Sequence, residues 1–324
     1  MPPADRLVVC IVTPGTPSAN NGNWRTAVRW AELLRDRCEV IVQTEWDGRP
    51  ADVLVALHAR RSAPSIERFA SRHPDRGIAA VLTGTDLYRD LPASVEAVAS
   101  LDRAHRIAVL QDDAMHLLEP RWREKARVIF QSAPRLPPAG KPRDRLQCVV
   151  VGHLRVEKDP ATLFDALRMI PRELPIHVRH LGAPLDEALA HEARALARED
   201  ARYVYEGGVP HESARLALQG AHLLVHPSVI EGGANVIVEA VTAGTAVIAS
   251  RISGNVGMLG ALYPGLFEPR DASGLASQLV RAWKEPAWRD VLGEACARRE
   301  PLFRPEAEQA AVEALVRAAH RAGR

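Results

Sequence analysis

The sequence predicts an α/β protein of two domains, each built around a doubly wound parallel sheet. Three observations predict this fold class. Short, β-branched apolar runs alternate with stretches of helical period through both halves of the chain, which is typical of βαβ units. Each half opens with such a run that ends beside a glycine-containing loop, like the first unit of a doubly wound sheet. Between the halves, residues 133–142 are rich in proline and predict a linker, with a cleft between the domains.

The first half is expected to begin with a buried strand at Arg6–Val12, followed by a polar loop. A helix over Trp24–Arg37 comes next, because Trp30, Leu33 and Leu34 recur on one side at helical spacing. The loop lacks the GxGxxG pattern, so a dinucleotide-binding fingerprint is absent. Further strands are expected at Val40–Gln43, Val53–Leu57, Ile78–Leu82, Ile107–Leu110 and Val128–Phe130.

The second half repeats this alternation, starting from a strand at residues 147–151 that ends at Gly152. Further strands are expected at Ile176–Leu181, Tyr203–Tyr205, Leu223–Val225 and Ala246–Ala249. Helices are expected at Pro160–Ile170, Asp186–Glu199, Glu212–Gln219, Asn235–Ala243 and, at the end of the chain, Pro305–His320.

The composition describes a soluble globular protein, with 47% apolar and 25% charged residues among 324. A formal net charge of +2 gives no reason to expect nucleic acid or an anionic membrane as a partner. No apolar run reaches the roughly 18 residues of a membrane span, and no signal segment opens the chain, so we expect a cytoplasmic protein. The four cysteines are scattered without metal-ligand spacing, so we expect neither a disulfide framework nor a metal site.

The most informative stretch runs from His226 to Ala240. An apolar strand enters a Pro-Ser turn, a glycine pair and then a helix, with Glu231 before the helix and Glu239 within it. The glycines let the backbone approach a ligand, and the start of the helix attracts phosphate. Two carboxylates beside a phosphate are explained if Glu239 contacts a ribose and Glu231 a second sugar, which is the shape of a nucleotide-sugar. The alternative is a strand–loop–helix corner with solvated acids.

A second candidate loop, Gly152-His-Leu-Arg-Val-Glu-Lys158, follows the first strand of the second half. Arg155 and Lys158 are three residues apart, so both can point at one centre. A guanidinium binds phosphate oxygens through two hydrogen bonds, and a lysine adds a point charge. The alternative is an ordinary solvated basic loop.

Together, the two stretches resemble the retaining GT-B glycosyltransferases of the large family 4 type, which carry a G-R-L-x-x-x-K loop and an E-x7-E motif. The resemblance covers essentially the whole chain. It implies two Rossmann-like domains facing across a cleft: residues 1–140 on the acceptor side, joined by a terminal helix at 305–324 that crosses back, and residues 141–304 as the nucleotide-sugar-binding domain.

The resemblance also implies roles for individual residues. Arg155 and Lys158 would hold the donor diphosphate, Glu231 the transferred sugar and Glu239 the ribose. His153 stands where the family has arginine, so one cation is replaced by a group that is neutral near pH 7. Further donor contacts are expected from Gly208, beside the base, and from the backbone at Gly233, Ala234, Asn235 and Val236. Neither a cofactor nor a metal is implied, because the UDP-sugar is a substrate and the two cations neutralise its diphosphate.

Within this family, three motifs look like those of the selenosugar synthases of selenoneine biosynthesis. They are a Thr13-Pro segment with Gly22-Asn-Trp-Arg-Thr, the run Leu82-Thr-Gly-Thr-Asp-Leu-Tyr88, and Glu231-Gly-Gly-Ala-Asn235. The resemblance implies transfer of a hexosyl group from UDP-GlcNAc or UDP-glucose to selenophosphate, with formation of a carbon–selenium bond.

Selenophosphate is a small anion, so its pocket should be cationic and rich in N–H groups. The loop that opens the first helix has this geometry, and Asp86 could orient a sugar hydroxyl or cap a helix. For the two arginines that could clamp the anion, Arg25 and Arg89, the alternative is an ordinary surface position. The candidate acceptor residues are Asn21, Gly22, Asn23, Arg25, Thr85 and Asp86.

Three rival functions remain open. A family 4 transferase with a lipid or saccharide alcohol as acceptor would favour a basic, aromatic face such as Trp24, Arg25, Arg29 and Trp30. A UDP-sugar-binding protein without catalysis would have lost one of the charged motif residues, and all of them are present. A UDP-sugar 2-epimerase would need several catalytic carboxylates in the first domain.

Overall fold

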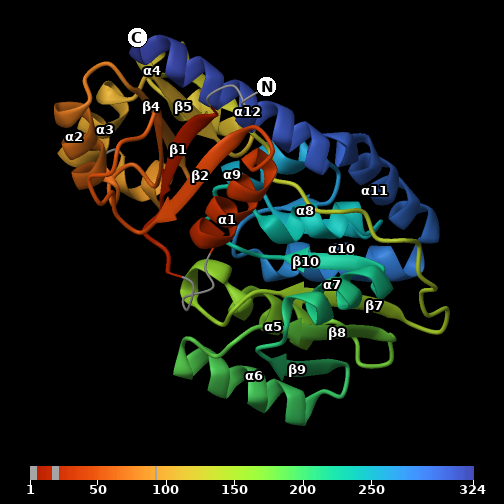
Figure 1. Ribbon diagram of the computed structural model, residues 1–324. Coiled ribbons are helices and arrows are strands. Elements are labelled where there is room, and N and C mark those ends of the chain that lie inside the picture. The colour runs from red at the N-terminus through yellow and green to blue at the C-terminus, as the bar shows by residue number, and fades with distance from the viewer. Residues whose placement is uncertain (1–5, 17–21, 92) are drawn as a thin grey trace. The chain divides into compact units, whose positions relative to one another are not determined.

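The computed structural model describes residues 6–16, 22–91 and 93–324, and the chain divides into two compact α/β units (Figure 1). The first unit comprises Met1–Ser132 and Pro305–Arg324, and the second comprises Ala133–Arg304. Each unit contains one six-stranded sheet in which all described strands run parallel. The predicted fold class, two Rossmann-like parallel α/β domains, is therefore confirmed.

The first sheet has the strand order β2-β1-β3-β4-β5-β6. Its strands are β1 (Leu7–Val12), β2 (Cys38–Gln43), β3 (Val53–Leu57), β4 (Gly77–Leu82), β5 (Arg106–Val109) and β6 (Ala126–Val128). Its helices are α1 (Gly22–Leu34), α2 (Ala63–Arg72), α3 (Val95–Arg103), α4 (Pro120–Arg123) and α12 (Pro305–Gly323), with a π-helical turn at Asp86–Asp90 and a 3-10 turn at Asp113–Leu117.

The first sheet is buried on both faces, which explains why its strands are continuous apolar runs. Along β1, Val9 and Ile11 pack in the same cluster as Trp30 of α1, whereas Cys10 and Val12 point to the opposite face, into the cluster of Phe69. The cluster of Trp30 also contains the apolar stripe of α12, formed by Val312, Leu315, Val316 and Ala319. The last helix of the chain therefore completes the core of the first unit.

A buried carboxylate fixes α12 to the first unit. Glu308 is 1% exposed and accepts hydrogen bonds from Arg29 Nε at 2.8 Å and Trp30 Nε1 at 2.7 Å, both in α1. It also accepts a 2.8 Å bond from the backbone N–H of Ser132, the last residue of the first segment of this unit. These bonds satisfy a charge that would otherwise be costly to bury.

The second sheet has the order β12-β11-β10-β7-β8-β9. Its strands are β7 (Leu146–Val151), β8 (Ile176–Leu181), β9 (Tyr203–Gly207), β10 (Leu223–His226), β11 (Ala246–Ser250) and β12 (Leu266–Phe267). Its helices are α5 (Pro160–Met169), α6 (Glu187–Glu199), α7 (His211–Gly220), α8 (Asn235–Thr242), α9 (Ser253–Leu259), α10 (Ala272–Lys284) and α11 (Pro286–Arg299), with 3-10 turns at Val156–Lys158 and Glu300–Phe303.

The proline-rich stretch lies against the second unit. Lys141 Nζ donates to the Gly244 carbonyl at 3.0 Å, Gln219 Nε2 donates to the Pro137 carbonyl at 2.6 Å, and the Arg215 guanidinium donates to the Pro134 carbonyl. We expected residues 133–140 to belong to the first domain, and instead they belong to the second unit. The two side-chain donors from α7 thus satisfy carbonyls that a proline-rich segment cannot pair within itself, and Lys141 of the segment donates to the turn after α8.

Candidate active site

The second sheet brings the two candidate loops together. The chain runs from β7 outward to β9 and then places β10 on the other side of β7, so β7 and β10 flank the point at which the strand order reverses. Ligands of open parallel sheets bind at this position, beyond the carboxyl ends of the strands. The loop after β7 and the loop after β10 are joined there by a 2.9 Å hydrogen bond from the Val229 N–H to the Glu157 carbonyl.

At this junction, Lys158 and Glu231 form an ion pair. The Lys158 Nζ donates to Oε1 of Glu231, and the two side chains are only 19% and 12% exposed. Burial alone would raise the pKa of the Glu231 carboxyl, but the Lys158 charge and His226 outweigh burial and hold that pKa well below its usual range. The pair is therefore an ionised carboxylate and an ammonium held close together with little water around them.

His226, the last residue of β10, lies next to the Glu231 carboxylate of this pair. It is 2% exposed, and its Nε2 is 3.2 Å from Glu231 Oε1 without an aligned hydrogen bond. Burial lowers the pKa of His226, so its imidazole is neutral at physiological pH. The side chain adds a polar group to the site without adding a second cation.

The loop after β8 packs closely against the loop after β7. Gly182 lies so close to it that a Cβ there would stand 1.9 Å from the Gly152 carbonyl oxygen. His180, 1% exposed, places Nε2 3.2 Å from the same oxygen and Nδ1 2.8 Å from the Tyr203 hydroxyl. His153 Nδ1 accepts a 3.0 Å bond from the Ala183 N–H. These contacts fix the backbone from which Lys158 projects.

The loop carrying Glu231 is fixed by residues that the sequence reasoning missed. A Cβ at Gly254 would lie 1.9 Å from the Glu231 carbonyl oxygen, so only glycine allows α9 to approach this closely. The hydroxyl of Ser250 donates to the Ser228 carbonyl, and Asn255 Nδ2 donates to Ser250 O and Oγ at 3.0 Å. All three polar side chains are fully buried. Their only sequence signal is a Ser-Gly-Asn run after a strand, which is common in loops.

The second carboxylate, Glu239, lies one turn inside α8 and is 8% exposed. Its Oε1 is 2.7 Å from Nε2 of His211, the first residue of α7. The first turn of α8 carries no acidic residue, and its N-cap, Ala234, supplies no side-chain hydrogen bond. The N–H groups at residues 234–236 therefore keep the anion-attracting character expected of a helix start.

Other predicted donor residues lie around the same loops. Gly233 and Asn235 are half-buried, whereas Ala234 and Val236 are buried, so only their backbone can face a ligand. Gly208 is exposed beside Ala183, next to the loop that supports Gly152.

Arg155 stands apart from this cluster. It lies on the same loop as Lys158 with an exposed side chain, and no residue in the described ranges forms an ion pair with it. The structure therefore brings together Lys158, Glu231 and His226, but not the second predicted cation.

The predicted acceptor residues differ in where they lie and in what they can contact. Asn21 lies outside the described residues, whereas Gly22, Asn23 and Arg25 form the first turn of α1. The expectation that Asp86 faces an acceptor is wrong. Its carboxylate is fully buried and accepts backbone N–H bonds from Ala59, Thr83, Gly84 and Leu87 at 2.9–3.1 Å. Three donors close in sequence and one from the loop after β3 hold this side chain inside, where it organises the two loops and cannot meet a ligand.

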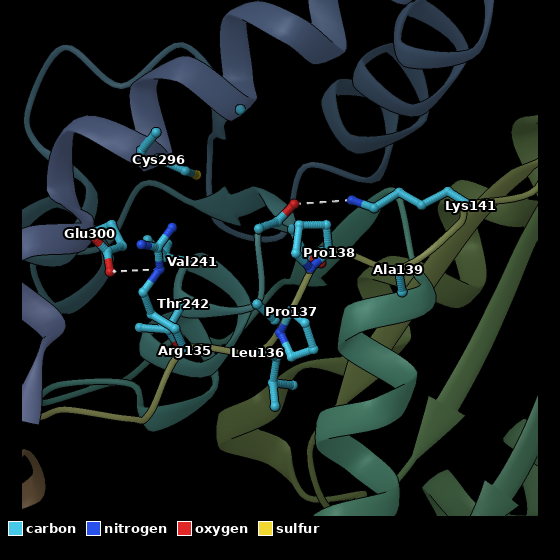
Figure 2. Close-up of a pocket in the computed structure, with 15 residues that line it drawn as sticks. Arg135, Leu136, Pro137, Pro138, Ala139, Lys141, Val241, Thr242, Cys296 and Glu300 are labelled. Carbon is cyan, nitrogen blue, oxygen red and sulfur yellow. Dashed lines mark hydrogen bonds and ion pairs between the residues drawn. The ribbon is translucent and has the colours of Figure 1, made fainter.

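A cavity of about 710 Å³ lies at the opposite end of α8 from Glu231 (Figure 2). It is lined by the linker, residues 135–141, by the end of α8 and by α11. Figure 2 shows Arg135 paired with Glu300 and Lys141 bonded to a backbone carbonyl across it. This cavity is separate from the candidate site because it opens at the amino-terminal edge of the sheet.

Within the described ranges, no three His, Cys, Asp or Glu side chains gather closely enough to hold a metal ion. None of the helices described combines the length and apolarity needed to cross a membrane.

Two Rossmann-like parallel α/β units make up the GT-B fold of glycosyltransferases. The chain belongs to the family of glycosyl transferases group 1, whose sequence profile matches residues 136–299, or 164 of the 324 residues. The match contains the Lys158, Glu231 and Glu239 positions.

One relative from Bacillus subtilis matches part of the chain. The putative teichuronic acid biosynthesis glycosyltransferase TuaC of Bacillus subtilis is 28% identical over 155 residues, which are 48% of this chain and 37% of that protein. The chain thus spans little more than a third of that relative's length.

Two examples represent the solved structures that share the fold. The sucrose-phosphate synthase of Thermosynechococcus elongatus matches with a TM-score of 0.78 at 19% identity, over 96% of this chain and 98% of that one. Anabaena HepE, in complex with UDP-glucose, matches with a TM-score of 0.73 at 15% identity, over 96% and 99%.

Proposed function

We propose that the protein is a selenosugar synthase that transfers a hexosyl group from UDP-GlcNAc or UDP-glucose to selenophosphate. The observation that carries the transferase part is the buried Lys158–Glu231 pair at the point where the second sheet reverses its strand order. The resemblance of the motifs around Gly22, Thr85 and Glu231 to selenosugar synthases supports the acceptor. The binding of UDP-glucose by HepE, which has the same fold, supports the donor.

The proposed reaction breaks the bond between the anomeric carbon and the diphosphate oxygen and forms a bond from that carbon to selenium. UDP leaves with the bonding electron pair, so negative charge grows on the diphosphate while positive character grows on the sugar. Lys158 and the start of α8 stabilise the growing negative charge, and Arg155, exposed on the same loop, turns inward to join them. Selenium in selenophosphate is ionised and soft, so the nucleophile needs no general base.

The carboxylates bind hydroxyl groups in this scheme. Glu231 accepts hydrogen bonds from the transferred sugar, and its ion pair with Lys158 keeps it ionised and fixed in place. Glu239 accepts from the ribose, and His211 orients its carboxylate. Both roles need an acceptor of hydrogen bonds rather than a base.

His153 replaces a cation of the family motif with a hydrogen-bond donor. Burial and the charges of Arg155 and Lys158 lower the pKa of His153, so the ring is neutral at pH 7. Its Nδ1 already accepts from the Ala183 N–H, which leaves the proton on Nε2. We propose that this Nε2–H donates to a diphosphate oxygen.

A second candidate is a transferase with a lipid or saccharide alcohol as acceptor. The name of the relative TuaC, a putative teichuronic acid biosynthesis glycosyltransferase, favours it. Two of the four residues of the basic, aromatic face on which this alternative depended are not available, however. Trp30 is fully buried and Arg29 is bound to Glu308, so neither can form an exposed docking surface for such an acceptor.

One assay tests the proposal. Purified protein is incubated with UDP-GlcNAc or UDP-glucose and selenophosphate, and UDP and selenosugar phosphate are measured by mass spectrometry. We expect UDP release that requires selenophosphate, that persists in EDTA without any added cofactor, and that Lys158→Ala abolishes. Lys284→Ala, at the exposed end of α10, is the matched control. Turnover with a saccharide alone would replace the proposal with the second candidate. Formation of an epimerised donor would indicate an epimerase, and donor binding without turnover would indicate a protein that only binds UDP-sugars.

The cytoplasmic location stays a prediction, to be checked by cell fractionation.

A further inference from the structure

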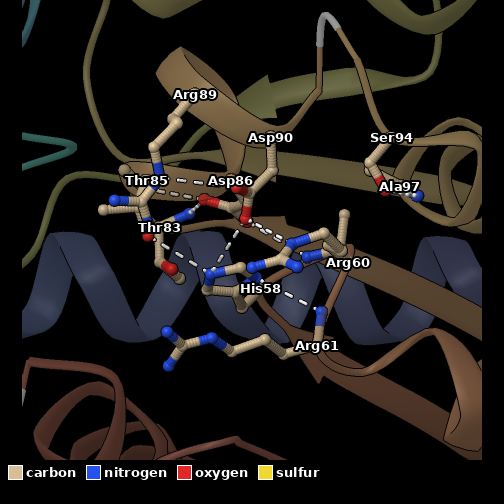
Figure 3. Close-up of polar contacts among 12 residues, drawn as sticks. His58, Arg60, Arg61, Thr83, Thr85, Asp86, Arg89, Asp90, Ser94 and Ala97 are labelled. Carbon is tan, nitrogen blue, oxygen red and sulfur yellow. Dashed lines mark hydrogen bonds and ion pairs between the residues drawn. The ribbon is translucent and has the colours of Figure 1, made fainter.

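The first unit contains an arginine-rich cluster that the donor chemistry does not use. It is formed by residues 58–62, which follow β3, and residues 83–90, which follow β4 (Figure 3). The chain places β2 on one side of β1 and β3 on the other, so the strand order of this sheet reverses between β1 and β3. The loop after β3 therefore borders the position at which open parallel sheets bind ligands.

The two loops of the cluster are locked together by buried hydrogen bonds. Asp86 Oδ1 accepts from the N–H groups of Thr83 and Gly84, both at 2.9 Å, and its Oδ2 accepts from the Ala59 N–H at 3.1 Å. Ser62 Oγ donates to the Leu57 carbonyl at 2.6 Å. The loops thus form a rigid framework, which is what a site for a small ligand requires.

His58 fixes the hydroxyl of Thr85 within this framework. It is 1% exposed and holds a left-handed backbone conformation with φ of +67°, which is uncommon for a residue other than glycine. Its Nδ1 accepts from the Arg61 N–H at 3.4 Å, so the neutral ring carries its proton on Nε2, 3.2 Å from Thr85 Oγ1. Because that oxygen accepts from His58, the half-buried hydroxyl of Thr85 keeps its own hydrogen to donate to a ligand.

Three arginines, Arg60, Arg61 and Arg89, lie on the two loops that form this framework, and one carboxylate contacts two of them. Asp90, 8% exposed, has Oδ2 2.8 Å from Arg60 Nε and Oδ1 3.5 Å from Arg89 Nε. Arg61 is exposed, and Figure 3 shows its guanidinium extending away from Asp90, on the other side of His58 from Arg60. Arg61 therefore has a guanidinium that no described carboxylate neutralises, next to the positive start of α2.

We propose that residues 58–62 and 83–90 bind the acceptor through its phosphate-class oxyanion, with Arg61 as the main cation and Thr85 as a hydroxyl donor. The inference rests on the proposed function, because it identifies which residues would hold selenophosphate. A guanidinium and a hydroxyl bind oxygen atoms far better than selenium. Binding through the oxygens leaves the soft selenium atom as the nucleophile, and it also explains why a neutral alcohol would be a poor acceptor. His58 is a positioning residue, since it acts through Thr85.

Steady-state kinetics of two variants test the site. We expect Arg61→Ala to raise the KM for selenophosphate about ten- to hundredfold, the usual worth of a charge-assisted hydrogen bond, and to leave the KM for the UDP-sugar unchanged. Thr85→Val keeps the shape of the side chain and removes the hydroxyl, and should raise the same KM about tenfold. Arg72→Ala, exposed at the far end of α2, is the matched control and should behave as wild type. An unchanged selenophosphate KM in both variants would overturn the inference.

A binding measurement separates this inference from the proposed function. Inorganic phosphate is titrated calorimetrically into the full-length protein saturated with UDP, which occupies the donor site. Binding that Arg61→Ala abolishes and Arg72→Ala retains supports the anion site, whichever acceptor the enzyme uses. Equal binding to wild type and Arg61→Ala refutes the site, even if the wild type turns over selenophosphate. If wild type binds phosphate in this way but does not turn over selenophosphate, only the proposed function fails.

Discussion

Replacing Gly254 by alanine tests whether α9 positions Glu231, the carboxylate proposed to bind the transferred sugar. A Cβ at this position would lie 1.9 Å from the Glu231 carbonyl oxygen and 2.9 Å from the Glu231 Cβ. Real contacts of a Cβ begin at about 3 Å, so the Glu231 backbone must move by about 1 Å. Crowding of this kind costs about 1–3 kcal/mol of stability. A shift of about 1 Å at a catalytic group costs about a hundredfold in rate.

The matched control is Gly293→Ala in α11, where a new Cβ would meet no atom within 4 Å. Because alanine favours helix more than glycine does, this control should be equal to wild type or more stable by about 0.5–1 kcal/mol. UDP release measures the rate and thermal unfolding measures stability. We expect Gly254→Ala to lose about a hundredfold in kcat while folding cooperatively. A Gly254→Ala protein with wild-type kcat would refute the reasoning, because it would show that the loop tolerates the displacement.

Three further predictions follow from the geometry. Lys158→Ala should lower kcat about a hundredfold or more, because it leaves a buried carboxylate without its cation. Glu231→Gln should lower kcat less, because glutamine keeps a hydrogen-bonding side chain, and the reverse order in the UDP-release assay would contradict the proposed roles. Burial lowers the pKa of His180 to about 4, so below pH 6.5 the unfolded chain binds a proton that the folded protein does not bind. The free energy of unfolding of the wild type should therefore fall by about 3 kcal/mol between pH 6.5 and 4. In urea unfolding, His180→Gln should show a shallower pH dependence, and an equally steep one would be inconsistent with this cause. Glu308→Ala removes the carboxylate that binds Arg29 and the Ser132 N–H, so it should lower the free energy of unfolding in urea by about 3 kcal/mol or more. Alanine at the exposed Glu306 should leave that free energy unchanged, and equal stability of the two variants would rule out a stabilising role for the buried network.

Much of the fold was predictable because the strands are buried on both faces. The strand Val53–Leu57 was predicted to the residue, since a run of five apolar side chains between polar flanks allows few other structures. The strand Leu266–Phe267 was missed because two residues carry no periodicity. Helix α11 was missed for a different reason. Its buried residues, Leu292, Ala295 and Cys296, form too small a stripe to mark a face.

The sequence located the candidate site only where charged residues themselves gave the signal. Glu231 and Lys158 stood out by type and spacing, and the structure brings them together. Gly254 and His58 gave no comparable signal, because their roles depend on close approach and on a hydrogen bond between distant loops. Asp86 was misread because its position after a strand suggested a ligand, while neighbouring N–H groups bind its carboxylate inside.

The packing of α12 has a consequence for how the protein is made. Residues 305–323 fill one side of the first sheet, yet they are synthesised after the whole second unit. Until α12 has been synthesised, the apolar face of β3 and β4 that it covers lacks this helix, and Arg29 and Trp30 lack the Glu308 carboxylate that binds them. The unit that is translated first is therefore finished last. Synthesis of α12, rather than synthesis of the first sheet, therefore sets the moment from which this core can close.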